Sequence, residues 1–302
     1  MITRVATFPM SDQMIAGALR TEATMAGLNI QQASGVQSQV LAGYGANTQH
    51  VINLEVSATR AQSYIDAANL ADGKIQAMMT QLNSVNDGLN NFSSQLSAAT
   101  VGSSAAMNSA ISDARQMLGE MSGILNAQYD GQYLFGGART STSPVDLSTF
   151  STGTGSLTTV DTSYYKGDFE IASVRVGPDR TVSYGVTADN PAFEQVLRVL
   201  KFVANSTSLS STDLTSAFDL VKSTVDSVAT VLAKLSNADA QVQSAQSEQI
   251  SYKGFVQTLG SELTGVDVAA VTAQLSTYQA QLTASFSALA KIQSLNLASF
   301  LR

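Results

Sequence analysis

The chain of 302 residues contains no cysteine, no tryptophan and a single histidine, His50. Without cysteine it has no disulfide framework and offers no thiolate for catalysis or for zinc binding. One histidine leaves no histidine pair for a metal ion and little capacity for general base chemistry. We therefore expect no cofactor, no metal site and no enzymatic activity, and we expect His50 to lie on a polar helix surface.

Charged residues are also scarce, because they make up 13% of the chain, about half of their usual share. The 16 lysines and arginines are outnumbered by 23 aspartates and glutamates, which gives a formal net charge of −7. Since binding to phosphate backbones depends on concentrated positive charge, this balance argues against nucleic acid as a partner. No run approaches the roughly 20 apolar residues that span a bilayer, so no membrane insertion is expected. The first residues lack the apolar stretch of a cleaved secretory signal.

Only four prolines are present, and three of them, Pro144, Pro178 and Pro191, lie in one region of the chain. Proline costs about 3 kcal/mol in a helix interior, so the long proline-free tracts on either side permit long helices. Glycine, serine and threonine are dense around the three prolines. The pattern predicts helical ends that flank a non-helical middle.

Apolar residues in the proline-free tracts recur at helical spacing. One stripe spans residues 54–96, with polar interruptions at Asp72 and Asn86. A heptad seam spans residues 214–235, as in helices that pair with one another. In the middle, alternation within residues 171–186 on both sides of a Gly-Pro turn predicts a β-hairpin. We therefore expect a mainly α fold: a long antiparallel helical rod from both chain ends with a small β-rich middle domain.

Both ends of the chain are almost uncharged. No charged residue occurs between Ala23 and Leu54, and the last segment carries charge only at Asp267, Lys291 and Arg302. A helix that is surrounded by water normally carries charges on its outer face. We infer that both ends are buried between copies of the same chain.

Two segments carry a resemblance to a known family. Residues 125–137 read Leu-Asn-Ala-Gln-Tyr-Asp-Gly-Gln-Tyr-Leu-Phe-Gly-Gly, and residues 267–302 form an apolar helical stretch that ends Leu-Ala-Ser-Phe-Leu-Arg. These segments are similar to the turn after the paired N-terminal helices, and to the C-terminal helix, of the bacterial flagellin family. The resemblance covers residues 1–137 and 192–302. It implies an extracellular subunit of the bacterial flagellum that is exported without a cleaved signal peptide.

The resemblance leaves the member of the family open. The Phe-Leu-Arg ending is typical of filament flagellins, whereas the Phe-Gly-Gly of residues 135–137 and the segment 164–168 favour hook-associated protein 3. The main hypothesis is a structural subunit of the flagellar filament that self-assembles for motility. The alternative is the hook–filament junction protein, and a secreted adhesin displayed through the β-rich middle is a third hypothesis.

The implied partners are copies of the chain in a helical polymer, hook-associated proteins, an export chaperone and the flagellar type III export apparatus. Many flagellins present an arginine-containing helix face to host receptors, but residues 85–96 contain no arginine. We therefore do not extend receptor activation to this chain. The resemblance implies five zones: an N-terminal inner-tube helix at 1–45, N-terminal rod helices and turn at 46–137, a variable β-rich surface region at 138–190, C-terminal rod helices at 191–260 and a C-terminal inner-tube helix at 261–302.

Self-assembly would then rest on the terminal helices. Isolated helices are marginal in water, so we expect these helices to be mobile in a free subunit and to fold on polymerisation. An open helical polymer requires heterologous contacts between copies. The apolar residues expected at these contacts are Ile15, Leu19, Leu28, Ile30, Leu275, Leu282, Phe286, Leu289, Ile292 and Phe300.

Overall fold

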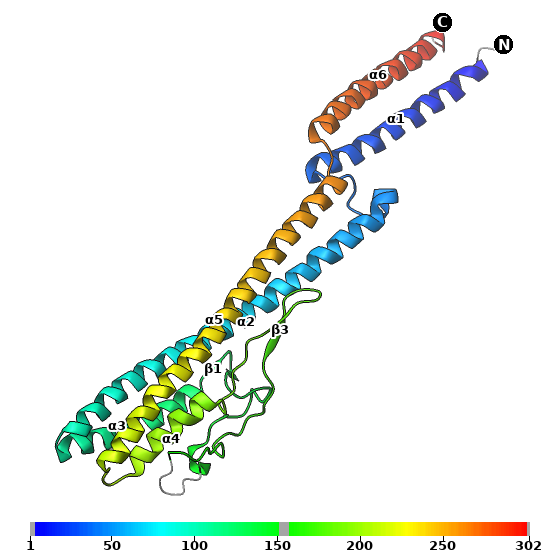
Figure 1. The fold of residues 1–302 in the computed structure, drawn as a ribbon. Coiled ribbons are helices and arrows are strands. Elements are labelled where there is room, and N and C mark those ends of the chain that lie inside the picture. Colours follow the sequence, from blue (N-terminus) through cyan, green and yellow to red (C-terminus); the bar gives the residue numbers. More distant parts are fainter. Residues whose placement is uncertain (1–3, 151–156, 301–302) are drawn as a thin grey trace. The chain divides into compact units, whose positions relative to one another are not determined.

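The computed structural model describes the backbone of residues 4–150 and 157–300, and the side chains of residues 10–150 and 157–292. The described residues form six α-helices, two 3₁₀ helices and two small antiparallel sheets (Figure 1). The prediction of a mainly α fold with a small β-rich region is confirmed. The chain divides into two compact units, which we call the terminal unit (residues 1–59 and 253–302) and the central unit (residues 60–252).

The helices follow one another along the chain, with the strands grouped between the third and the fourth. The α-helices are α1 (Arg4–Ser34), α2 (Thr48–Val101), α3 (Ser104–Leu125), α4 (Pro191–Asn205), α5 (Ser211–Thr264) and α6 (Val268–Phe300). The 3₁₀ helices are η1 (Leu41–Asn47) and η2 (Leu147–Thr149). The strands are β1 (Gln128–Tyr129), β2 (Gln132–Tyr133), β3 (Ser173–Arg175) and β4 (Thr181–Ser183).

One hydrophobic core holds the central unit together. The predicted stripe of α2 is buried from Ala61 to Ala99, and it meets the apolar faces of α3, α4 and α5. On α5, the heptad seam buries Val221, Val228 and Leu235. Both periodic patterns therefore mark core-facing sides of helices, as expected from their spacing.

Helices α2 and α5 run antiparallel within the central unit. Three side-chain hydrogen bonds cross between them: Gln76 Nε2 to Asp239 Oδ2 at 2.9 Å, Gln243 Nε2 to Asp72 Oδ1 at 3.0 Å, and Gln246 Nε2 to Asn69 Oδ1. Each step toward the N-terminus on α2 matches a step toward the C-terminus on α5. The three bonds therefore define the register of the pair, which we call the α2–α5 seam.

The turn after α3 is a tight hairpin. Strands β1 and β2 pair antiparallel, with Asp130 and Gly131 between them at φ values of 50° and 72°. Two successive positive φ values are typical of the type I′ turn, for which Asp-Gly is a preferred sequence. The turn that the family resemblance implies within residues 125–137 is therefore present.

The predicted β-hairpin of the middle region is also present. Strands β3 and β4 pair antiparallel, with Val174 opposite Val182. Both valines are buried in the core of the central unit. Arg180, which lies just before β4, forms an ion pair at 3.2 Å with Glu248 of α5. Because both side chains are exposed, this pair contributes to positioning more than to stability.

The two segments that favoured hook-associated protein 3 lie against each other. The backbone N–H of Asp168 donates to the carbonyl of Gly136 at 3.2 Å, and Ala138 N donates to Asp168 Oδ1 at 2.8 Å. Hydrogen bonds from the backbone of Ala138 and Glu170 hold the pKa of Asp168 below its usual range. Gly137 has a φ of +70°, and a Cβ at this position would lie 2.2 Å from Asp168 Oδ1. The contact therefore depends on the absence of a side chain at residue 137.

Replacing Gly137 by alanine should lower the free energy of unfolding by about 2 kcal/mol, because the new Cβ meets the Asp168 carboxylate in a left-handed conformation. The matched control is Gly123→Ala in α3, where a Cβ would meet nothing within 4 Å. This control should raise stability by about 0.5–1 kcal/mol, as usual for a helix interior. Urea unfolding measures both, and equal effects of the two variants would contradict the close approach at Gly137.

Candidate self-assembly surface

Helices α1 and α6 lie side by side and antiparallel in the terminal unit (Figure 1). Leu28 of α1 packs with Val271 and Leu275 of α6 in a small buried cluster. Next to it, Gln32 Nε2 donates to Thr272 Oγ1 at 3.0 Å. The two ends of the chain therefore meet each other within a single molecule.

Paired backbone turns determine where this contact begins. Gly35 ends α1 with a φ of +70°. Beyond it, Gln37 N donates to the carbonyl of Thr264 at 2.7 Å, and Val266 N donates to the carbonyl of Gly35 at 3.0 Å. These bonds join the turn after α1 to the turn between α5 and α6. Glycine suits this position because it adopts positive φ without strain.

The outer face of α1 carries three of the predicted assembly residues. At 100° per residue, Ile15, Leu19 and Ile30 fall within about 60° of one another, and Leu28 lies on the opposite side of the helix. The three side chains are 40%, 61% and 52% exposed, whereas Leu28 is 8% exposed. We call Ile15, Leu19 and Ile30 the α1 outer face. In an isolated chain this face exposes large apolar side chains to solvent, an arrangement typical of interaction surfaces.

On α6 the large side chains lie on one face and the small side chains on the other. Leu282 and Leu289 share the face of Leu275, which turns toward α1, and both are half-buried. Phe286 lies on the same face but is 52% exposed. The opposite face presents small exposed residues, which we call the α6 small-residue face: Ala273, Thr277, Ala280 and Ala284.

The structure divides the predicted assembly residues into two groups. Leu28 and Leu275 contact each other's helix within one chain, a role that the sequence analysis did not foresee. Ile15, Leu19 and Ile30 point outward, and Ile292 is half-buried near the end of α6. The side chain of Phe300 lies outside the described residues. The role of these residues in assembly, and the folding of the terminal helices on polymerisation, stay predictions.

The sequence analysis missed the α6 small-residue face. Alanine and threonine are frequent along the whole chain, so a row of them does not stand out in the sequence as a stripe of large apolar residues does. The signal that could have revealed this face is the four- and three-residue spacing of Ala273, Thr277, Ala280 and Ala284. Side chains of this size let another helix approach closely, so this face is suited to helix packing.

A hollow of about 720 Å³ lies elsewhere in the terminal unit, between the first turns of α2 and the last turns of α5. Leu54 and Ala58 of the predicted α2 stripe line it, together with Leu41, Tyr44 and Val256. The α2 stripe therefore continues beyond the part that the central core buries. Like the α1 outer face, this hollow leaves apolar side chains partly exposed to solvent.

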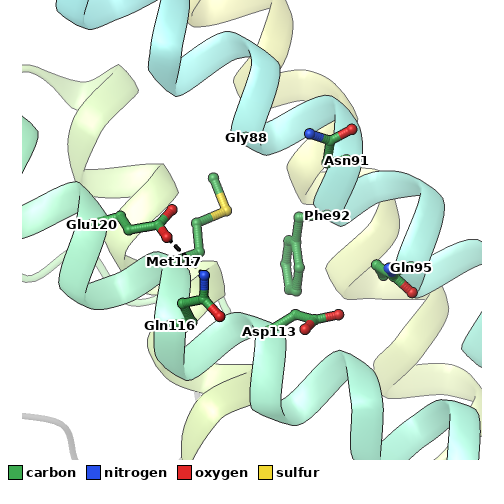
Figure 2. A pocket seen from close by; sticks show the side chains of 8 residues that line it. All are labelled: Gly88, Asn91, Phe92, Gln95, Asp113, Gln116, Met117 and Glu120. Carbon is green, nitrogen blue, oxygen red and sulfur yellow. Dashed lines mark hydrogen bonds between the residues drawn. The ribbon is translucent and has the colours of Figure 1, made fainter.

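A second, smaller groove of about 210 Å³ lies between α2 and α3 in the central unit (Figure 2). Phe92 and Met117 form its apolar part, and Gly88 leaves room for Met117, whose Cε would lie 2.9 Å from a Cβ at residue 88. Gln116 Nε2 donates to Glu120 Oε1 at 2.9 Å along the rim. The lining combines amides and carboxylates with no basic side chain and no nucleophile–base pair, so it offers no catalytic constellation.

Three further observations concern sites that the sequence excluded. Within residues 10–150 and 157–292, no group of three or more histidine, aspartate or glutamate side chains could hold a metal ion. None of the helices in the described part of the chain is long and apolar enough to cross a bilayer. His50 is exposed on the first turn of α2, as predicted.

Comparisons with known proteins identify the fold. No protein-family model matches the chain, and no curated protein sequence matches it. A solved structure described as a flagellar hook-associated protein from Vibrio parahaemolyticus matches with a TM-score of 0.60 at 15% identity, over 72% of this chain and 97% of that one. This chain has the fold of that flagellar protein. The resemblance to the flagellin family is thereby confirmed at the level of the fold.

Two other solved structures also match. FlgL from Bacillus cereus has 12% identity and a TM-score of 0.46, over 72% of this chain and 98% of that one. FlgL from Xanthomonas campestris has 11% identity and a TM-score of 0.43, over 76% of this chain and 98% of that one.

The contact between Leu28 and α6 can be tested in the dilute, unassembled chain. Leu28→Ala removes a buried side chain at a cost of about 2 kcal/mol, so amides of α1 should exchange hydrogen at least about tenfold faster. Leu19→Ala is the matched control, because Leu19 lies on the same helix and is exposed. Exchange that responds equally to both variants would contradict the packing of α1 on α6 and would favour terminal helices that fold only on polymerisation.

Proposed function

We propose that this protein is a structural component of the bacterial flagellum that joins the hook to the filament. The observation that carries the proposal is the shared fold, which covers nearly the whole length of a flagellar hook-associated protein. The contact between residues 135–138 and Asp168 adds support, because it unites the two segments that favoured the junction protein. The main sequence hypothesis, a filament subunit, has less support from the comparisons.

In this role the protein works outside the cell and carries out no reaction. It is exported through the flagellar type III apparatus with the help of an export chaperone. Its contacts are copies of itself, the hook-associated proteins and the subunits on either side of the junction. The scarcity of charge at both ends of the chain suits such surroundings, because a protein neighbour replaces water there.

Assembly uses the two unlike faces of the terminal helices. The α1 outer face presents Ile15, Leu19 and Ile30, and the α6 small-residue face of a neighbouring copy presents small exposed side chains against which they pack. Burial of each large apolar side chain contributes roughly 1.5–3 kcal/mol. Because the two faces differ, the contact is heterologous and can repeat around a tube. Leu28 and Leu275 hold α1 and α6 together so that each copy presents both faces.

Leu19→Asp should abolish assembly of the full chain and leave the monomer folded, because the carboxylate would be buried against the neighbour and exposed in the free subunit. Sedimentation velocity and circular dichroism measure the two properties. Leu70→Asp is the matched control, since Leu70 is a half-exposed leucine of α2 in the central unit. The α1 outer face would be ruled out as a contact if Leu19→Asp assembled like the wild type. Leu282→Asp should also abolish polymer, but Leu282 faces α1 and the change would disturb the monomer as well.

The position of the protein in the flagellum separates the junction role from the filament role. Immunogold electron microscopy of intact flagella should place the label at a single point, where the hook meets the filament. Cells that lack the protein should make hooks without attached filaments. Label along the whole filament would instead identify a filament subunit. Intact filaments with lost surface attachment would favour the adhesin hypothesis.

A further inference from the structure

Two carboxyl groups face each other across the α2–α5 seam. Gln243 Nε2 donates to Asp72 Oδ1 at 3.0 Å and to Asp239 Oδ2 at 3.1 Å. Gln76 Nε2 donates to the same Asp239 Oδ2 at 2.9 Å. A single amide nitrogen therefore bridges the two acids across the seam.

One oxygen of this pair has no donor. Asp239 Oδ1 is buried and, within the described part of the chain, has no hydrogen-bond partner. A buried carboxylate oxygen without a donor is costly, and a second carboxylate beside it adds repulsion. A proton on Asp239 Oδ1 reduces both costs, because the group loses its charge and the orphaned oxygen becomes a hydroxyl.

The charged and titratable side chains with known contacts near the seam interact with other groups. Lys74 of α2 donates to Gln132, and the hydroxyl of Tyr129 of β1 lies beside Gly73. Arg180 pairs with Glu248 of α5 and donates to the carbonyl of Gln241. None of these groups is among the influences on the ionisation of Asp239, which are its burial, Asp72 and Gln76.

We propose that Asp72 and Asp239 share one proton and form a pH-dependent clasp across the α2–α5 seam. Below the titration midpoint the proton on Asp239 bonds the two helices together. Above it the proton leaves to solvent, both acids are ionised, and their repulsion loosens the seam. The clasp belongs to the central unit, so it is independent of the proposed function and of assembly.

The energetics support this sign. Burial, followed by the hydrogen bond and charge of Asp72, raises the pKa of Asp239 from 3.8 to about 6, against a lowering by the Gln76 amide. The folded chain therefore binds this proton more tightly than the unfolded chain. The stabilisation is fully present below about pH 4 and is lost as the pH rises through about 6.

The test uses the full-length chain at a concentration where it is monomeric. Carbon-13 NMR of the aspartate carboxyl groups should show Asp239 titrating near pH 6, and Asp72→Asn should lower that midpoint by at least one unit. Thermal unfolding of the wild type should shift to lower temperature between pH 4.5 and pH 7.5. Asp239→Asn supplies an amide donor in place of the proton, so it should remove most of this shift. At pH 7.5 the unfolding temperature of this variant should be higher than that of the wild type.

Controls separate the clasp from general acid effects. Asp66→Asn should keep the wild-type shift, because Asp66 is exposed on α2 and accepts from Gln62 of the same helix. Burial also raises the pKa of Glu194, which pairs with Arg198. Glu194 is present in every variant, so it leaves the same residual slope in all of them. A midpoint of Asp239 below pH 4.5, or an unchanged shift in Asp239→Asn, would overturn the proposal.

Discussion

The antiparallel packing of α2 on α5 is the interaction on which the rest of the central unit depends. The two helices come from opposite halves of the chain, and their apolar faces form the common core with α3 and α4. The β3–β4 hairpin buries Val174 and Val182 in the same core and reaches α5 through Arg180. Since the core is continuous, the position of each smaller element follows from the register of this one pair.

Polar residues within the seam have a role that apolar packing alone does not fill. An apolar stripe of similar residues packs comparably well after a slip by one heptad. Gln76, Gln243 and Gln246 lie at the solvent-exposed edge of the seam, and they would lose these partners after such a slip. The hydrogen bonds therefore favour one register. Two aspartates, Asp72 and Asp239, accept hydrogen bonds within the same network.

The terminal unit follows a different principle. Its helices α1 and α6 bury a small cluster around Leu28 and leave large apolar side chains outward on α1 and small ones outward on α6. A chain that buried all of its apolar surface internally would gain little free energy from assembly. Here the central unit has a continuous core, while the α1–α6 pair of the terminal unit buries only a small cluster.

The sequence by itself determined the long helices on both sides of a non-helical middle and the β3–β4 hairpin, because periodicity and turn residues are local properties of the chain. It also marked Asp72 as an interruption of the α2 stripe. Only the tertiary structure decided that Asp72 and Asp239 accept from the same Gln243 amide, and that Leu28 packs on α6 of its own chain while Leu19 points away. These outcomes depend on the register between segments far apart in the sequence. Hydrophobic periodicity shows which face of a helix is apolar, but it does not show which partner covers that face.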